Sequence, residues 1–167
     1  CKGKSVSLEV VGNTYEDMLS EALTLNKKFG RLGKIYVKIP VNPCFTNKCD
    51  KGADGIKTIR ALTRKGVKVN CTLVFTPEQA LLAAKAGAKY VSPFAGRIDD
   101  LIRQTAGIKF DRTDYFPKSG LQKKKKVLAD QGIKSGVDLI EQIRKEFDKQ
   151  GVKCKVLAAS LRNKRQF

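Results

Sequence analysis

The sequence contains no histidine, and it lacks a run of apolar residues long enough for a membrane-spanning helix. Such a helix needs about 18 or more consecutive apolar residues, so no transmembrane segment is expected. No signal-peptide pattern opens the chain either. Without histidine, a zinc site would depend on cysteines, and the one close pair, Cys44 and Cys49, is spaced more loosely than a zinc knuckle. We therefore expect no bound metal and a reducing, cytoplasmic location.

Five cysteines are an odd number and form no dense disulfide framework. Cys71 and Cys154 lie within apolar runs, where a free cysteine behaves as a small buried hydrophobic residue. The chain begins with Cys1 rather than methionine. We interpret this as the start of a partial sequence.

Acidic residues are few relative to basic ones: 16 against 34, a net charge of +18, with four consecutive lysines at 123–126. Such an excess attracts polyanions, and it can mark a nucleic-acid binder or help to draw in a phosphorylated metabolite. However, the basic residues are spread along the chain, without the interleaved aromatic residues on which bases stack. We interpret them as a solvated surface and do not expect nucleic acid as a partner.

Apolar segments of two kinds alternate along the 167 residues, 41% of which are hydrophobic, as suits one folded domain. Short apolar runs indicate strands, and segments with an apolar stripe at helical spacing indicate helices. The predicted strands are 6–11, 34–41, 67–75, 89–94 and 152–160. Helices are predicted from the capping residues Thr14, Thr76 and Ser135, and over 54–65. Alternation of this kind predicts an α/β fold with a parallel sheet covered by helices.

Two parallel architectures compete, an open doubly wound sheet and a (β/α)8 TIM barrel. The open sheet usually has a glycine-rich phosphate loop after a strand, and none of the strand–helix turns here has one. In a barrel, functional residues lie at the carboxyl ends of several strands. Polar or functional side chains recur at those ends here: Glu9, Lys38, Thr72, Ser92 with Phe94 and Arg97, and Ser160 with Arg162. The sequence therefore predicts the barrel.

Lys38 is the most informative residue of the chain, because it lies toward the end of the apolar run 34–41, two residues before Pro40. A lysine at the end of a core strand loses hydration, which disfavours the charged form of its amine. A neutral amine can attack a carbonyl and form a Schiff base. The alternative is an edge-strand lysine that points to water.

Several segments resemble the transaldolase family. They are Val-Ser-Leu-Glu-Val around Glu9, Val-Lys-Ile-Pro-Val around Lys38, 69–75 with 76–80, Ser-Pro-Phe-Ala-Gly-Arg-Ile-Asp-Asp from Ser92, and Ala-Ala-Ser-Leu-Arg ending at Arg162. The resemblance covers nearly the whole chain and is closest to the small, single-domain bacterial and archaeal type, which is related to fructose-6-phosphate aldolase.

This resemblance implies an enzyme that transfers a dihydroxyacetone unit between sugar phosphates in the pentose phosphate pathway, without metal or organic cofactor. Lys38 would form an imine with the ketone of fructose 6-phosphate or sedoheptulose 7-phosphate. Cleavage would release an aldose phosphate, and the bound enamine would then add to erythrose 4-phosphate or glyceraldehyde 3-phosphate. Glu9 and Thr72 would position the water that shuttles protons.

The other matched residues would bind substrate. The resemblance implies that Asn70 and Ser92 contact the sugar chain. Three further residues would hold the phosphate, by the planar fork of arginine and a hydroxyl donor: Arg97, Ser160 and Arg162. A related aldolase subgroup has tyrosine at the position of Phe94 and glutamine at that of Glu9, so the residues found here favour transferase over aldolase.

The sequence also departs from the family. The first two strands of the family barrel supply an aspartate and an asparagine, in Leu-Asp-Thr and Thr-Thr-Asn-Pro contexts, and neither motif occurs here. We expect an incomplete barrel of about five units, strands three to seven, forming a single partial domain over 1–167 with insertions near 42–53 and 103–126. Its open edges would favour pairing with another copy, so a homo-oligomer is expected. The alternatives are fructose-6-phosphate cleavage without transfer, and a non-catalytic, polyanion-binding relative.

Overall fold

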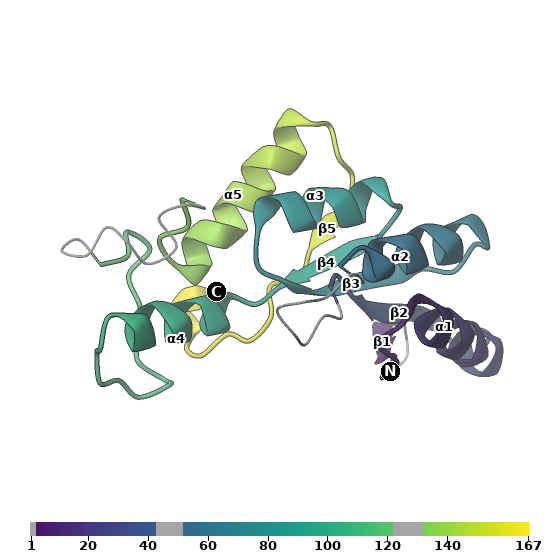
Figure 1. Ribbon diagram of the computed structural model, residues 1–167, viewed down its shortest axis with the longest axis horizontal. Helices are drawn as coiled ribbons and strands as arrows, with labels where there is room; N and C mark the ends of the chain where they lie inside the picture. The colour runs from purple at the N-terminus through teal and green to yellow at the C-terminus, as the bar shows by residue number, and fades with distance from the viewer. Residues whose placement is uncertain (1–2, 43–51, 122–131) are drawn as a thin grey trace.

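The computed structural model describes residues 3–42, 52–121 and 132–167 (Figure 1). The Cys44 and Cys49 pair and the lysine run 123–126 lie outside these residues, as do most of the predicted insertion near 42–53 and the end of that near 103–126. No helix in the described ranges is both long and apolar enough to cross a membrane.

The fold is α/β with one parallel, five-stranded sheet. The strands pair in the order of the chain: β1 (Ser5–Glu9), β2 (Lys34–Pro40), β3 (Val69–Val74), β4 (Tyr90–Pro93) and β5 (Lys155–Val156). This confirms the predicted strands and their parallel arrangement. The sequential order has no reversal of the kind that defines the switch point of a doubly wound sheet.

In the described ranges, five α-helices and one 3-10 helix accompany the sheet. They are α1 (Tyr15–Phe29), α2 (Asp54–Arg64), α3 (Pro77–Lys85), α4 (Ala95–Thr105), α5 (Gly136–Lys149) and η1 (Lys164–Gln166). The predicted caps are confirmed: the side chains of Thr14, Thr76 and Ser135 each accept a hydrogen bond from the backbone N–H three residues later. These bonds satisfy donors that the first helical turn leaves unpaired.

Two elements differ from the sequence-based expectation. Helix α4 was not predicted, and it begins after Phe94 without a side-chain cap, so the usual signal for a helix start is missing. The last strand is shorter than predicted, because β5 pairs with β4 at only two positions, Lys155 and Val156.

The two faces of the sheet have opposite character. Successive residues of a strand point to opposite faces, and on one face Val37, Ile39 and Val69 are fully buried under the helices. Figure 1 shows α2 and α3 lying along the sheet and α4 beyond the end of β4. The other face carries polar side chains, among them those of Glu9 and Lys38. This polar face holds the candidate site.

Candidate active site

Lys38 and Glu9 lie side by side at the ends of neighbouring strands. The pairing of β1 with β2 places Glu9 opposite Lys38, and because paired positions share a face, both side chains leave the sheet on the same side. The Nζ atom of Lys38 is 3.3 Å from Oε2 of Glu9, with the lysine side chain 23% exposed and the glutamate 50% exposed. Since β2 lies between β1 and β3, Lys38 is on an interior strand and not on an edge.

Asn70 links three strands next to this pair. It is 1% exposed, and its amide donates to Oγ of Ser7 at 3.2 Å while its carbonyl oxygen accepts from Oγ of Ser92 at 2.9 Å. A buried polar side chain with both of its groups satisfied is held in one orientation. Ser7 was missed by the sequence analysis. Ser7 precedes Glu9 by two residues on a strand, so the two side chains share a face of the sheet. This spacing could have identified Ser7 from the sequence.

Thr72 follows Asn70 on the same face of β3 and is fully buried. Its hydroxyl has no hydrogen-bond partner among the described residues. The next residue, Leu73, has a φ of 56°, and the pairing of β3 with β4 shifts register between Cys71 and Val74. Irregularities of this kind re-aim a strand's side chains and are common beside functional sites.

These residues surround a shallow hollow of about 400 Å³ on the polar face of the sheet. It is lined by Ser5, Ser7, Glu9, Lys38, Asn70, Ser92, Leu157, Ala158 and Ala159. The fold thus brings four of the predicted site residues together in one place, and Thr72 lies two residues after Asn70 on the same face of β3.

Arg97 and Arg162 meet at a second hollow, of about 390 Å³, beside α4. A third arginine, Arg112, lines the same hollow. Arg162 donates from Nη2 to Oδ2 of Asp100 at 2.8 Å, and the guanidinium of Arg97 lies 5.3 Å from the ring centre of Phe94. Two of the predicted phosphate-binding residues therefore come together here, in a hollow distinct from that of Lys38.

Ser160 lies where the chain after β5 reaches the start of α4. The backbone N–H of Ala95 donates to the carbonyl of Ala159, and a Cβ atom on Gly96 would lie 2.0 Å from the carbonyl oxygen of Ser160. Glycine is therefore required at 96 for this approach. The first turn of α4 has no acidic residue, so the positive end of its dipole suits an anion.

Asp99 anchors α4 from its buried side. Its carboxylate accepts from the backbone N–H of Gly136 and from Nε2 of Gln166, both at 2.7 Å. Burial raises the pKa of the Asp99 carboxyl, and these two hydrogen bonds partly offset the effect. Through Asp99, α4 is joined to the start of α5 and to η1, which holds the Arg162 segment in place.

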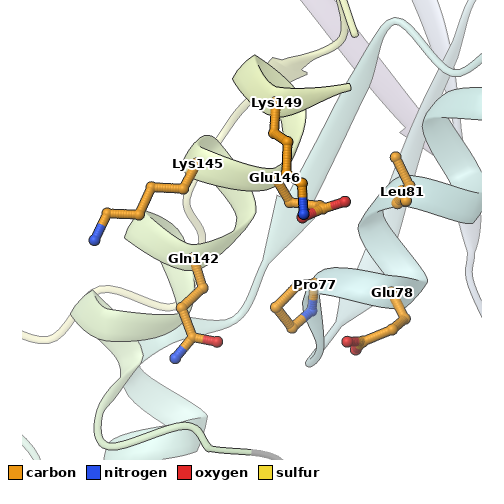
Figure 2. A pocket seen from close by; sticks show the side chains of 7 residues that line it. All are labelled: Pro77, Glu78, Leu81, Gln142, Lys145, Glu146 and Lys149. Carbon is orange, nitrogen blue, oxygen red and sulfur yellow. The ribbon is translucent and has the colours of Figure 1, made fainter. Parts of the chain in front are cut away.

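A further groove, of about 420 Å³, runs between α3 and α5 (Figure 2) and carries none of the predicted site residues. Its lining residues are Pro77, Glu78, Leu81, Gln142, Lys145, Glu146 and Lys149. In Figure 2 the ammonium group of Lys145 points away from α3. In the described part of the chain, no cluster of three or more histidine, cysteine or acidic side chains could hold a metal ion.

A family model described as Transaldolase/Fructose-6-phosphate aldolase matches residues 2–167. The chain belongs to this transaldolase family. It is 38% identical over 158 residues to a probable transaldolase of Thermodesulfovibrio yellowstonii, covering 95% of this chain and 53% of that protein. It is 37% identical over 159 residues to a probable transaldolase of Petrotoga mobilis, covering 95% and 52%. With the probable transaldolase of Geobacter sulfurreducens, identity is 44% over 121 residues, covering 70% and 49%. This member of the transaldolase family thus spans about half the length of the curated relatives that it matches.

Proposed function

We propose that this chain carries out transaldolase-type chemistry, the transfer of a dihydroxyacetone unit between sugar phosphates through a Schiff base on Lys38. The observation that carries the proposal is the position of Lys38, a half-buried amine on an interior strand with its Nζ 3.3 Å from the Glu9 carboxylate. Membership of the transaldolase family supports the same chemistry.

We further propose that the five strands are strands three to seven of a (β/α)8 barrel, in a single partial domain with insertions near 42–53 and 103–126. The parallel order of the strands and the polar face at their carboxyl ends support this placement. The open edges of β1 and β5 favour completion by more polypeptide, and a second copy of the chain would supply it in a homo-oligomer.

The reaction begins when the neutral amine of Lys38 attacks the carbonyl carbon of fructose 6-phosphate. Loss of water from the carbinolamine gives a protonated imine, and this step needs protons delivered to the leaving oxygen. The Glu9 carboxylate lies next to Nζ of Lys38, and the buried Thr72 hydroxyl has no hydrogen-bond partner among the described residues. Together these two groups could hold a bound water that relays the protons.

Cleavage then breaks the bond between carbons 3 and 4 of the sugar. The electron pair moves to the imine nitrogen and gives an enamine, the proton of the 4-hydroxyl passes to a base, and glyceraldehyde 3-phosphate leaves. In the family that base is an aspartate in a motif that this sequence does not contain. The enamine carbon adds to the aldehyde of erythrose 4-phosphate, and hydrolysis of the new imine regenerates the amine.

Substrate binding is assigned to the two hollows. Asn70 and Ser92 are locked by hydrogen bonds and would contact the hydroxyl groups of the sugar. The phosphate would bind beside α4 to Arg97, Ser160 and Arg162, where guanidinium groups and a helix start favour an anion. Glu9 and Phe94 favour transfer over simple aldol cleavage. The reaction needs no cofactor and belongs to the pentose phosphate pathway, for which we propose a cytoplasmic location.

The test is borohydride trapping followed by intact-mass measurement. After incubation with fructose 6-phosphate and borohydride, the chain should gain one reduced adduct, and Lys38→Ala should abolish it. Lys57→Ala is the matched control, because Lys57 is an exposed lysine whose ammonium is 3.3 Å from Asp54, away from the site. An adduct of dihydroxyacetone size means imine formation with cleavage, and a whole-sugar adduct means imine formation alone. Absence of any adduct in a folded sample would contradict the proposal.

A further inference from the structure

A lysine stands at, or immediately before, the first residue of every strand of the described sheet. These strand-start lysines are Lys4, Lys34, Lys68, Lys89 and Lys155, and all five are exposed. Because the strands are parallel and adjacent in order, their first residues lie together at the amino-terminal end of the sheet. We call this end of the sheet the strand-start edge. A feature that looks scattered in the sequence is therefore a row of cations in the fold.

The segments that lead into the strands add to this charge. The stretches 3–4, 27–34, 64–68, 85–89 and 149–155 together contain thirteen basic residues and no acidic one, against a net charge of +18 for the whole chain. In α1, α2 and α3 the first turns, at the opposite ends of the helices, carry acidic residues such as Glu16, Asp54 and Glu78. In α5, by contrast, Asp148 lies directly before the stretch 149–155. The fold thus separates the charges, and most of the excess lies at the strand-start edge.

Stability of the fold does not explain this row. Basic residues in the last turns of helices, such as Lys27 and Arg64, interact favourably with the helix dipole. The strand-start lysines have no such reason, since sheets have only small net dipoles. None of the five forms an ion pair with a described residue. The described residues therefore do not neutralise the repulsion between these lysines, and a bound anion would reduce it.

Two aromatic rings lie among these lysines. Tyr36 shares a face of β2 with Lys34, and Tyr90 pairs in register with Lys155. Their ring centres are 4.9 Å apart in an edge-to-face arrangement, and the ammonium of Lys68 lies 6.0 Å from the centre of the Tyr36 ring. Both rings lie on the polar face that also carries Lys38, and both are partly exposed in the described residues. Cations that follow a phosphate backbone, combined with rings that stack bases, are typical of surfaces that bind single-stranded nucleic acids.

We propose that the strand-start edge binds single-stranded nucleic acid, with backbone phosphates on the strand-start lysines and bases against Tyr36 and Tyr90. We favour nucleic acid over an anionic lipid surface because the two rings lie among the cations, where bases bound through their phosphates can stack. Lys38 and Glu9 lie toward the other ends of their strands, so this binding does not depend on the sugar chemistry proposed above.

Fluorescence anisotropy with an end-labelled single-stranded RNA, titrated over a range of salt concentrations, tests the proposal. The decisive variant combines Lys34→Gln, Lys68→Gln, Lys89→Gln and Lys155→Gln. With a slope of about −0.7 in log K against log salt for each single-strand phosphate contact, losing four contacts should flatten the slope by about 2.8. At about 0.1 M salt the same loss should weaken binding by more than about a hundredfold.

The matched control removes four exposed lysines from elsewhere, with Lys109→Gln, Lys134→Gln, Lys145→Gln and Lys164→Gln. It should retain most of the affinity and slope. Replacing the four strand-start lysines by arginine should preserve binding, since the charge remains. Tyr36→Leu should weaken binding by about fivefold or more while leaving the salt slope unchanged, because stacking releases no counterions.

Three results would overturn the proposal. One is equal loss of affinity in the strand-start and control variants, which would show diffuse charge attraction. Another is RNA binding by the unsubstituted chain that is absent or insensitive to salt. The last is binding to phosphatidylserine-containing vesicles without binding to RNA, which would assign the edge to a membrane surface. Circular dichroism of each variant, together with the independent Tyr36→Leu readout, separates lost binding from lost folding.

Discussion

Glu9 and Lys38 occupy paired positions at the ends of β1 and β2, with Oε2 of Glu9 3.3 Å from Nζ of Lys38. The pair places a proton acceptor beside the one lysine of the candidate site hollow. A carboxylate there suits the proton transfers that the proposed imine formation requires.

Glu9→Gln should slow adduct formation without abolishing it. Glutamine keeps the shape of the side chain but cannot take up a proton, and general acid–base groups contribute about a hundredfold or more to such steps. The measurement is the initial rate of borohydride-trapped adduct by intact mass. A rate equal to that of the unsubstituted chain would contradict the role given to Glu9.

Asn70→Leu should destabilise the chain by about 1–3 kcal/mol, because the buried hydroxyl of Ser92 loses its hydrogen-bond partner. Urea unfolding followed by circular dichroism measures this change. Asn13→Leu serves as the control, since Asn13 is exposed and a surface substitution usually changes stability by less than about 0.5 kcal/mol. Equal effects of the two substitutions would show that the link between β1, β3 and β4 is not a source of stability.

Gly96→Ala should displace the segment that carries Ser160 and Arg162 from the start of α4. The added Cβ would lie 2.0 Å from the Ser160 carbonyl oxygen, which is backbone and has little room to move. We expect weaker binding of inorganic phosphate, measured by calorimetry, together with lower stability. Gly33→Ala is the control, because a Cβ there meets no atom within 4 Å. Phosphate affinity unchanged in the Gly96 variant would argue against a phosphate site at this junction.

Asp99 should make stability depend on pH in a defined direction. Burial raises the pKa of its carboxyl in the folded chain above that in the unfolded chain. Its contribution is therefore fully present below the unfolded value, about 3.9, and is lost as the pH rises through the folded value. The unfolding free energy of the unsubstituted chain minus that of Asp99→Asn should be larger at acidic pH than at pH 7. A difference that grows as the pH rises would contradict this assignment.

Local signals explain which parts of the fold were predictable. The start of α3 is specified by a four-residue signal, the capping box formed by Thr76 and Gln79. This capping box was predicted and is confirmed. Helix α4 was missed because Phe94 provides no side-chain cap. The burial of Cys71 and Cys154 was predicted from their apolar neighbours and is also confirmed.

The candidate site was predictable in composition but not in arrangement. Lys38 and Glu9 stand out at strand ends in the sequence, whereas the link from Ser7 through Asn70 to Ser92 depends on strand register across four strands. The row of strand-start lysines is likewise invisible until the parallel order of the strands is known. Long-range register, rather than local propensity, was the missing information.

The most direct test of the central claim is to locate the reduced adduct on the chain by peptide mapping. After fructose 6-phosphate and borohydride treatment, the digest should show the modification on the peptide that contains Lys38, with the strand-start lysines unmodified. Lys38→Ala should remove it without transferring it to another residue. Modification spread over exposed lysines, or concentrated on a lysine other than Lys38, would contradict the assignment of Lys38 as the nucleophile.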